Sequence, residues 1–377
     1  MCILDVICKN QQGISILTNT IAVIGGGVIG RLTAWRLAKE GYEVLLTDPL
    51  IGKIDQGQSR GNGTNASLGV LMGYVYRRNS GRAWKLRLQS MALWHKWIKE
   101  LTNKKLQVKI KTPLIQLARS DKEAFLMQEI AKQRKNYKVE FKSEIKKSYN
   151  NHFIKNDFGG LISYNDGIIN PLDLQNCLYK KLKEENIKIL TEAVSYIKKD
   201  TSLNNHSWSI KFMTGELILV NKVVLCCALG SNKIIKQLGY EDIIEPVLGQ
   251  ALEIELKSKN ETWQNWPAVL IHHGINLIPN GTGKLILGAT LEPGQYSSMM
   301  KLIELKLLNG FAPNWIKESK VLREWKGIRA KPINQPAPIL KKLEKGLFIA
   351  TGHYRNGLLL APATAEWVVD QIRNDYN

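Results

Sequence analysis

The feature that most constrains this chain is a glycine-rich stretch, GGGVIG, over residues 25–30. A mostly β-branched run precedes it at residues 21–24, and a helical pattern follows as far as Leu37. After a turn at Gly41, a second strand-like run, EVLLTD, ends at Asp48. A strand, a glycine turn, a helix, a second strand and a terminal acid in this order predict a βαβ unit that binds a dinucleotide.

Each part of this fingerprint has a physical task. Gly25 allows the tight turn, Gly27 lets the backbone approach a pyrophosphate, and Gly30 lets the helix pack closely on the strand. The start of the helix then holds the phosphates. Asp48 can accept a hydrogen bond from a ribose 2′-hydroxyl, which disfavours the 2′-phosphate of NADP. The motif alone does not separate NAD from FAD.

Length and composition set the outer limits. The chain has 377 residues, enough for two or three compact units, with 44% hydrophobic and 23% charged residues. No apolar stretch approaches the ~20 residues that span a bilayer. Residues 1–19 lack the basic start and the long apolar core of a signal peptide, so we expect an N-terminal extension and a cytoplasmic protein.

Neither cysteine nor histidine shows the spacing of a metal site. The cysteines are Cys2, Cys8, Cys177, Cys226 and Cys227. Their number is odd and none forms a CxxC pair, so we predict free thiols in a reducing compartment. We place Cys226 and Cys227 inside a buried strand. His272 and His273 are adjacent, and on a strand they would point to opposite faces. We predict no metal site.

The net charge of +20 is distributed unevenly. Residues 77–147 hold 20 Lys and Arg against 6 Asp and Glu, a net +14. Within this segment, residues 82–101 carry an apolar stripe at helical spacing, which predicts a core-packing helix with a solvated basic face. The alternatives to this structural role are that the segment binds an anionic membrane surface or that it binds RNA.

Three later segments have the pattern of further nucleotide-domain elements, at residues 166–190, 222–231 and 346–372. We therefore predict two interleaved domains. The nucleotide-binding domain is expected to comprise residues 20–76, 160–235 and 322–377. The substrate-binding domain is expected to comprise residues 77–159 and 236–321.

Taken together, the motifs resemble the FAD-dependent D-amino acid oxidase superfamily, and most closely its glycine oxidases of thiamine biosynthesis. The motifs that carry the resemblance are NASLGVL (65–71), DGIINP (166–171), LCCALGS (225–231), PVLGQ (246–250), KLILGATLEPG (284–294), WKGIRAKP (325–332) and ATGHYRNGLLLAPATAE (350–366). The resemblance implies an α/β fold, in which a Rossmann-like FAD-binding domain is interleaved with an α+β substrate domain built on an antiparallel sheet.

The resemblance also implies the residues that bind FAD. They are Gly25, Gly27, Val28, Ile29 and Gly30 of the fingerprint, Asp48 and Pro49 at the ribose, Gly63, Thr64, Leu68, Gly69 and Val70 in the loop over the flavin, Val194 at the adenine, Gly230, and the C-terminal run His353, Tyr354, Arg355, Asn356, Gly357, Leu358 and Leu359. The C-terminal run would bring backbone amides and a positive helix end to the flavin, which is anionic around N1 when it is reduced.

Three residues are implied at the substrate. Arg329 occupies the position that pairs with the substrate carboxylate, for which the planar guanidinium fork is well suited. Arg355 matches a second position near substrate and flavin. Ile271 and Asn276 replace two tyrosines found in the glycine oxidases, and Asn276 can still donate a hydrogen bond to the substrate. This replacement leaves room for a larger or anionic substrate.

The implied activity is oxidation of the C–N bond of glycine or a D-amino acid by hydride transfer to flavin. Its products are an oxo acid, ammonia and, with molecular oxygen as acceptor, hydrogen peroxide. The cysteine that links flavin covalently in sarcosine oxidases has no equivalent here, because no cysteine follows Cys227, so we expect non-covalent FAD. The family resemblance also implies a homo-oligomer. One alternative is the oxidation of an N-substituted glycine, either free or on tRNA. Another is a flavin-binding scaffold without turnover. A pyridine-nucleotide dehydrogenase is the least favoured alternative.

Overall fold

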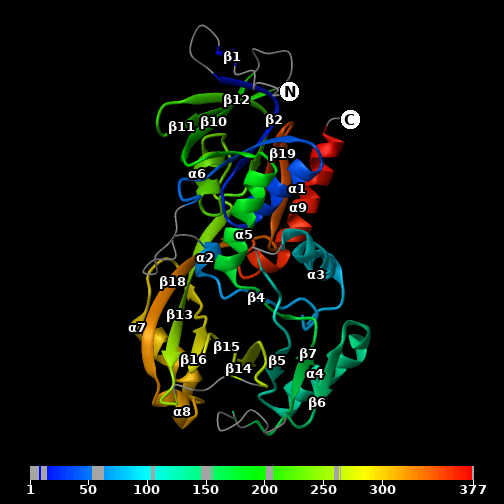
Figure 1. Ribbon diagram of the computed structural model, residues 1–377, viewed down its shortest axis with the longest axis vertical. Helices are drawn as coiled ribbons and strands as arrows, with labels where there is room; N and C mark the ends of the chain where they lie inside the picture. The colour runs from blue at the N-terminus through cyan, green and yellow to red at the C-terminus, as the bar shows by residue number, and fades with distance from the viewer. Residues whose placement is uncertain are drawn as a thin grey trace.

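The computed structural model describes residues 8–9, 15–52, 63–102, 107–145, 154, 156–200, 207–258, 263 and 265–375. The molecule is elongated, and its two large sheets lie one above the other (Figure 1). Between them lie α2 (Gly63–Ala66), β4 (Val70–Leu71) and α3 (Gly81–Leu101).

The upper sheet has the order β10-β11-β12-β2-β3-β9, and β20 pairs with β12. Its strands are β1 (Cys8–Lys9), β2 (Ser15–Ile24), β3 (Glu43–Thr47), β9 (Lys188–Leu190), β10 (Val194–Asp200), β11 (Ser207–Phe212), β12 (Leu217–Leu225), β19 (Ile339–Glu344) and β20 (Leu347–Thr351). The central strands β12, β2, β3 and β9 run parallel, and β20 runs parallel to β12. This part of the structure is the predicted Rossmann-like domain.

Alternate residues of β2 supply two different cores. Ile21 and Val23 belong to the cluster that includes α1 (Val28–Lys39), α5 (Pro171–Glu184) and α9 (Gly357–Asn374). Ala22 and Ile24 belong to a cluster with β11, β12 and α6 (Gly230–Lys236). A central strand that is buried on both faces is typical of a parallel sheet covered on its two sides.

The second sheet has the order β17-β13-β16-β15-β14-β5-β7-β6, and β18 pairs with β13. Its strands are β5 (Leu114–Leu117), β6 (Val139–Lys142), β7 (Gly160–Ser163), β13 (Ile244–Glu255), β14 (Val269–His272), β15 (Ile275–Pro279), β16 (Lys284–Gly288), β17 (Glu292–Pro293) and β18 (Lys320–Pro332). All its pairings except β14–β5 are antiparallel. The predicted fold class is confirmed.

Two helices cover one face of this sheet, and α4 (Asp121–Gln133) packs on the other face only along β6 and β7, so the rest of that face points to the interior of the molecule. Buried Leu302 and Leu305 of α7 (Met299–Lys306) and Ile316 of α8 (Asn314–Lys317) pack in one cluster with Leu252 and Leu287 of the strands. Because strand side chains alternate between faces, their neighbours in sequence point the opposite way, toward α2 and the upper sheet. The site described below lies on that inner face.

Two predicted boundaries differ from the observed elements. Strand β2 begins at Ser15 and pairs with β1 (Cys8–Lys9), so regular structure starts before residue 20. Strand β18 pairs with β13 along the second sheet, although we grouped residues from 322 onward with the nucleotide-binding domain. Both boundaries depend on which strand each segment pairs with, and the local sequence pattern does not reveal the pairing partner. The domain limits themselves stay a prediction.

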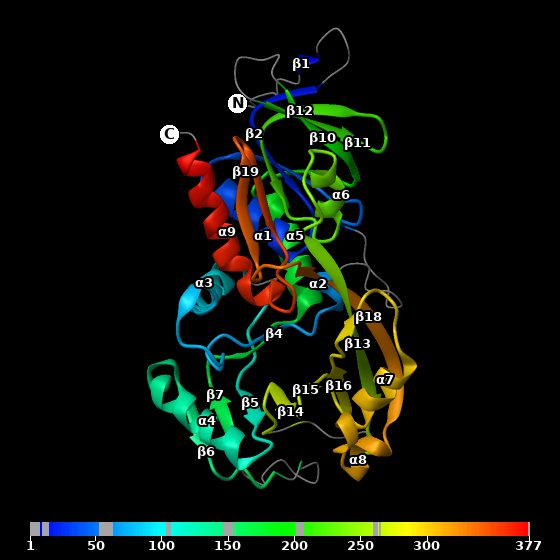
Figure 2. The same ribbon diagram turned by 180° about the vertical axis from the view of Figure 1, so that it is seen from behind.

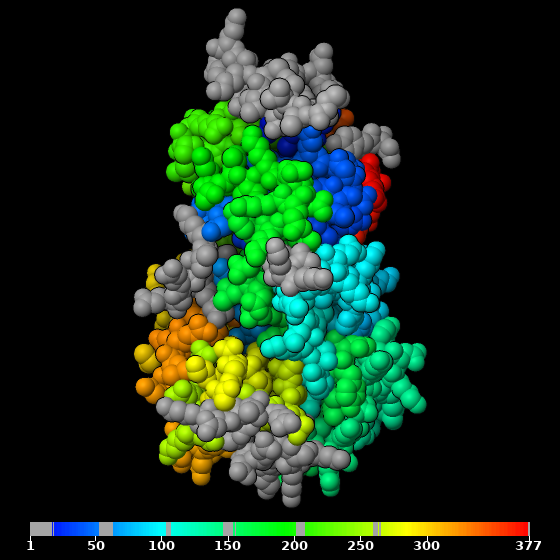
Figure 3. Space-filling view, viewed as in Figure 1, coloured from blue at the N-terminus to red at the C-terminus, as the bar shows by residue number. Residues whose placement is uncertain are grey.

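Helix α3 lies against α9, as the view from behind shows (Figure 2). The helix predicted over residues 82–101 is confirmed, with Met91, Trp94 and Leu101 fully buried. Its basic residues Arg82 and Lys85 are exposed, as are Lys96 and Lys99. Part of this helix forms the outer surface in the middle of the molecule (Figure 3). Of the helices that the structure describes, none has the length and apolar character needed to cross a membrane.

Candidate active site

The glycine turn of the fingerprint is too crowded for any side chain. Gly25 has φ +112°, and a Cβ there would come within 2.6 Å of the carbonyl carbon of Cys226. A Cβ on Gly30 would lie 1.7 Å from the carbonyl oxygen of Gly25. The turn is therefore held between α1 and the segment after β12, in which Gly230 begins α6.

The groups around this turn can bind an anionic dinucleotide. Helix α1 begins after Gly27, which has no side chain to cap it, and its first turn contains no acidic residue. Thr64 Oγ1 accepts a hydrogen bond from the amide of Val28 at 3.1 Å. The next amides of this helix start, together with the helix dipole, favour a phosphate. These residues fit the pyrophosphate of FAD.

Asp48 follows β3 and lies beside this turn. Its carboxylate accepts hydrogen bonds from the amides of Gly26 at 2.7 Å and Leu50 at 2.8 Å. A carboxylate has about four acceptor positions, so Asp48 can still accept from a ribose hydroxyl. Thr47 Oγ1 donates to the carbonyl of Glu192 at 2.8 Å, which brings the start of β10 at Val194 near the same strand end. The ribose and adenine roles of Asp48, Pro49 and Val194 stay predictions.

The loop predicted to cover the flavin lies between the fingerprint and β18. Gly69 has φ +80°, and a Cβ there would lie 1.9 Å from the carbonyl oxygen of Ile169. Trp325 Nε1 donates to the carbonyl of Ala66 at 3.0 Å, and Gly327 leaves space for the Ala66 methyl group. The loop that contains Gly63, Thr64, Leu68, Gly69 and Val70 is thereby fixed between β18 and the segment around Ile169.

Asp166 binds the backbone of the segment that follows this loop. Its side chain is fully buried and accepts backbone hydrogen bonds from Gly73 at 2.8 Å, Tyr74 at 3.0 Å and Val75 at 3.0 Å. Burial raises the pKa of Asp166, and the three N–H donors oppose that rise. Strand β4 also pairs with β8 (Gly167–Ile168), directly after Asp166. One buried side chain therefore organises the segment that follows the flavin loop.

The C-terminal run forms a turn that is tied to β18. Tyr354 has φ +54°, and its amide donates to the carbonyl of Ala330 at 3.0 Å. This bond places the turn directly beside Arg329. Helix α9 then begins at Gly357, with Asn356 as its N-cap. The predicted helix start at the flavin run is confirmed, whereas its contact with the flavin ring stays a prediction.

Helix α3 compensates for a proline inside α9. Pro362 has no N–H for the carbonyl of Leu358 and interrupts the helix ladder. Trp94 Nε1 donates to that carbonyl at 3.1 Å. Ser90 Oγ donates to the carbonyl of Leu359 at 2.6 Å and accepts from the amide of Ala363 at 3.3 Å. The first turn of α9 is thus satisfied and held rigidly, although it contains a proline.

His353 gives this run a pH dependence that can be measured. Burial, with a smaller contribution from Arg82, lowers the pKa of His353 to about 3, and its Nε2 lies 2.8 Å from Thr364 Oγ1. The unfolded chain binds this proton near pH 6.5, so the folded state loses stability as pH falls from about 6.5 toward 3, by about 1.4 kcal/mol per unit. We expect His353→Gln to reduce the loss between pH 6.5 and 4.5 by roughly 2 kcal/mol, as measured by urea unfolding. Parallel stability curves for the two proteins would contradict this assignment.

Arg329 lies on the inner face of the second sheet. Its Nη1 donates to the carbonyls of Leu248 and Thr290, both at 3.1 Å. The guanidinium lies over Gly249, where a Cβ would come within 2.2 Å of Nη2. Burial, and then the charge of nearby Arg355, lower the pKa of Arg329. Two cationic groups are therefore held together on one side of the site, with Arg355 the more exposed of the two.

Asn276 and Ile271 are paired on adjacent strands and share the inner face with Gly288 and Ala251. Asn276 Nδ2 donates to the carbonyl of Gly288 at 2.9 Å, so one of its two N–H groups is used within the sheet. Rows of side chains on one face of a strand lie roughly 7 Å apart. Arg329 pairs with Val247, which is two side-chain rows away from Ala251 on the same face. Arg329 therefore lies on the same face as Asn276 but in a different row. A substrate contact of Asn276 stays a prediction.

Sequence reasoning missed Arg87, a buried arginine of α3. Its Nη1 donates to the carbonyl of Met72 at 2.8 Å, and its Nη2 donates to Asn356 Oδ1 at 3.0 Å. It also stacks on Tyr76, with the guanidinium carbon 4.0 Å from the ring centre. Arg87 therefore joins the segment directly after β4 to the start of α9. A basic residue on the buried side of a helix, beside Trp84 and Met91, was the available signal.

The cysteines and histidines near the site do not form a metal centre in the described part of the chain. Cys226 and Cys227 are free thiols that follow β12 and do not lie within it. His272 ends β14, and His273 has φ +48° in the turn that follows. Their rings lie 4.4 Å apart because of this turn, whereas we expected opposite faces of a strand.

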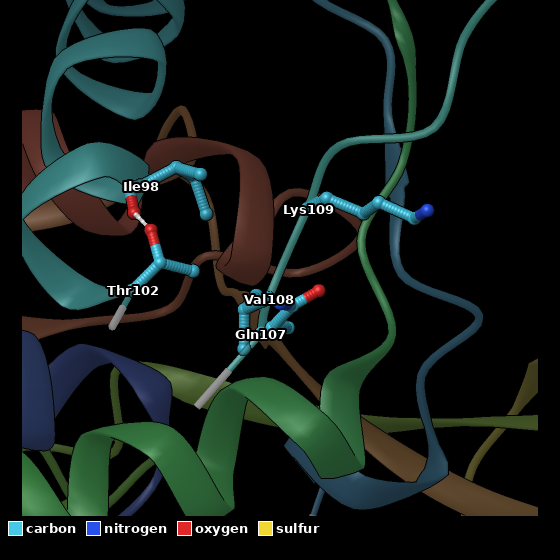
Figure 4. Close-up of a pocket in the computed structure, with 5 residues that line it drawn as sticks. All are labelled: Ile98, Thr102, Gln107, Val108 and Lys109. Carbon is cyan, nitrogen blue, oxygen red and sulfur yellow. Dashed lines mark hydrogen bonds between the residues drawn. The ribbon is translucent and has the colours of Figure 1, made fainter. Parts of the chain in front are cut away.

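Two hollows are present near these elements. One, of about 330 Å³, lies at the end of α3 and is lined by Ile98, Thr102, Gln107, Val108 and Lys109 (Figure 4). Thr102 there bonds the Ile98 carbonyl, and Lys109 extends away from both (Figure 4). The other hollow, of about 300 Å³, lies beside Arg329. Only the second is next to a predicted substrate-binding residue.

Comparison with known proteins agrees with this geometry. A family model described as FAD dependent oxidoreductase (DAO) matches residues 20–371. Glycine oxidase of Bacillus subtilis (strain 168) is 26% identical over 364 residues, covering 93% of this chain and 92% of the relative. These matches confirm the predicted resemblance.

Solved structures show the same fold. The crystal structure of glycine oxidase from Geobacillus kaustophilus matches with a TM-score of 0.79 and 22% identity, covering 95% of each chain. The crystal structure of iminodiacetate oxidase from Chelativorans sp. BNC1 matches with a TM-score of 0.77 and 17% identity, covering 94% of this chain and 95% of that one.

Proposed function

This chain belongs to the DAO family of FAD-dependent oxidoreductases, and from that premise we propose that it oxidises the C–N bond of a small amino acid, either glycine or a D-amino acid. The observation that carries the proposal is Arg329, whose guanidinium is fixed on the inner face of the second sheet by Leu248 and Thr290. It offers a carboxylate a planar pair of donors opposite the FAD-binding domain.

The residues of this chain position and stabilise charge. Arg329 holds the substrate carboxylate, and Arg355 adds positive charge beside it. The start of α1 would hold the pyrophosphate of FAD, and the start of α9 would direct a positive helix end to its ring. When bound, FAD supplies the acceptor for the hydride of the amine. The imino product leaves and hydrolyses to an oxo acid and ammonia, and molecular oxygen or another acceptor takes up the electrons.

Three further features are part of the proposal. FAD is bound non-covalently, since no cysteine follows Cys227 in the sequence. The protein is cytoplasmic, as its cysteine pattern predicts, and forms a homo-oligomer, as the family resemblance implies. The glycine oxidases that match along nearly the whole chain support an amino acid as substrate.

A second candidate function is the oxidation of an N-substituted glycine, either free or on tRNA. It is favoured by the basic residues of α3, among which Arg82, Lys85, Lys96 and Lys99 are exposed. A polyanion that contacts several such residues would bind in a strongly salt-dependent way. Retarded migration of bulk tRNA at low salt would support this candidate. Binding to anionic vesicles without binding to tRNA would instead assign the basic segment 77–147 to a membrane surface.

The proposed function is tested by the visible spectrum of the purified protein under anaerobic conditions. We expect flavin bands, and we expect glycine, sarcosine or one of the D-amino acids to bleach them. A protein that stays colourless after FAD is supplied would contradict FAD binding. Bands that none of these amines or the L-enantiomers bleach would contradict amino acid oxidation.

A further inference from the structure

The hollow beside Arg329 is formed by three neighbouring strands and the C-terminal turn. Its lining residues are Glu245, Pro246, Val247, Leu291, Pro293, Gly294, Lys331 and Tyr354. Strand β13 lies in the centre, with β18 on one side and β17 on the other. Gly294 donates its amide to the carbonyl of Pro246 at 3.0 Å, which closes the hollow on the β17 side.

The register of β13 and β18 places this hollow directly next to the arginine. Val247 is opposite Arg329, and Glu245 is opposite Lys331. Opposed residues of an antiparallel pair point to the same face, and the next pair on that face is roughly 7 Å away. The hollow therefore begins one side-chain row from the guanidinium and opens on the same face. A carboxylate bound to Arg329 would carry its substituents to within reach of it.

The walls of the hollow are mainly apolar. Val247, Leu291 and Pro293 lie on the face shared with Arg329, and the Tyr354 turn lies against it. Leu291 is 50% exposed, so a ligand that covered it would remove apolar surface from water. Lys331 forms an ion pair with Glu245, so this pair adds no net charge to the hollow. The lining thus favours an uncharged apolar group over a second carboxylate.

We propose that this hollow is the subsite for the substrate side chain, and that the chain prefers amino acids with an unbranched or branched aliphatic side chain over glycine. The inference rests on the proposed function, because it takes Arg329 as the carboxylate partner. A volume of about 300 Å³ is at the lower end of the range of ligand pockets, roughly 300–1,000 Å³, and accommodates a short aliphatic chain. Glycine would leave the subsite empty.

The first experiment measures binding without turnover. The FAD-loaded protein is titrated with acetate, butanoate and hexanoate, and the change in the flavin absorbance gives each Kd. We expect affinity to rise about fourfold per methylene, in line with about 0.8 kcal/mol for each buried CH₂. Equal affinity for acetate and hexanoate would overturn the subsite.

The second experiment measures preference. Glycine, alanine, norvaline, norleucine and glutamate, in both enantiomers where they exist, are compared by anaerobic flavin reduction. We expect norleucine of one configuration to exceed glycine by at least tenfold in kcat/KM. Leu291→Trp, which fills the hollow, should lower that ratio at least tenfold, whereas Leu126→Trp, at an exposed leucine of α4 (Asp121–Gln133), should not change it.

The outcomes separate this inference from the proposed function. Reduction by glycine or sarcosine alone would overturn the subsite and leave amino acid oxidation standing. A preference for glutamate would overturn the apolar class of side chain, and a ratio that Leu291→Trp leaves unchanged would overturn the location. Flavin that none of the amino acids reduces, together with carboxylate affinity that rises with chain length, would contradict the proposed function and retain the binding subsite.

Discussion

Replacing Arg329 by alanine should lower kcat/KM for the amino acid at least 100-fold while FAD remains bound. The guanidinium is the group on this face that is oriented for a carboxylate, with Leu248 and Thr290 holding its Nη1 and Gly249 making room for it. A hydrogen bond to a charged group contributes about 1.5–3 kcal/mol, and a bidentate pair contributes two of them. Anaerobic rapid-mixing kinetics of flavin reduction give the loss directly, and the FAD content is read from the same sample.

Two further variants test whether the loss comes from the planar guanidinium itself, from its positive charge alone or from a general effect on folding. Arg329→Lys keeps the positive charge but loses the planar fork, so we expect it to recover only part of the activity. Arg119→Ala removes an exposed arginine outside the site, one that pairs with Glu123 in the first turn of α4. It should reduce kcat/KM less than threefold. If Arg329→Ala reduced flavin as fast as the unchanged protein, the carboxylate would have to bind elsewhere.

The FAD-binding half of the site could be predicted because its physics is local. Gly30 packs against the carbonyl of Gly25, and Asp48 accepts from the amide of Gly26, so both act within one βαβ unit. The predicted turn before α9 was likewise a matter of neighbouring residues. Sequence spacing is enough where the interacting groups belong to consecutive elements.

The substrate half depends on contacts that the chain makes over long separations. Gly249 is 80 positions from Arg329, and the space that it leaves for the guanidinium follows only from the register of β13 and β18. Arg87 reaches Asn356 from a different domain segment. Pairing register and turn geometry, which a single sequence leaves open, decide each of these contacts.

Asp166 is another residue whose contacts lie far away in the sequence, and replacing it is expected to lower the stability of the protein strongly. Asp166→Ala removes the acceptor of three buried amides, those of Gly73, Tyr74 and Val75. Each unpaired buried donor costs about 1–3 kcal/mol, so we expect the free energy of unfolding to fall by roughly 3–6 kcal/mol. That is a large part of the 5–15 kcal/mol available to a typical domain. Urea unfolding of the FAD-loaded protein measures the change.

The same variant should also release FAD, because the three amides directly follow the loop that contains Gly69 and Val70. When their acceptor is lost, the loop loses its support on the β8 side and the preorganised contact with the dinucleotide weakens. Asp242→Ala is the matched control, since that exposed carboxylate makes only a surface ion pair with Lys236, worth about 0–1 kcal/mol. An Asp166→Ala protein that kept its FAD through gel filtration and unfolded within about 1 kcal/mol of the control would show that these amides find another acceptor.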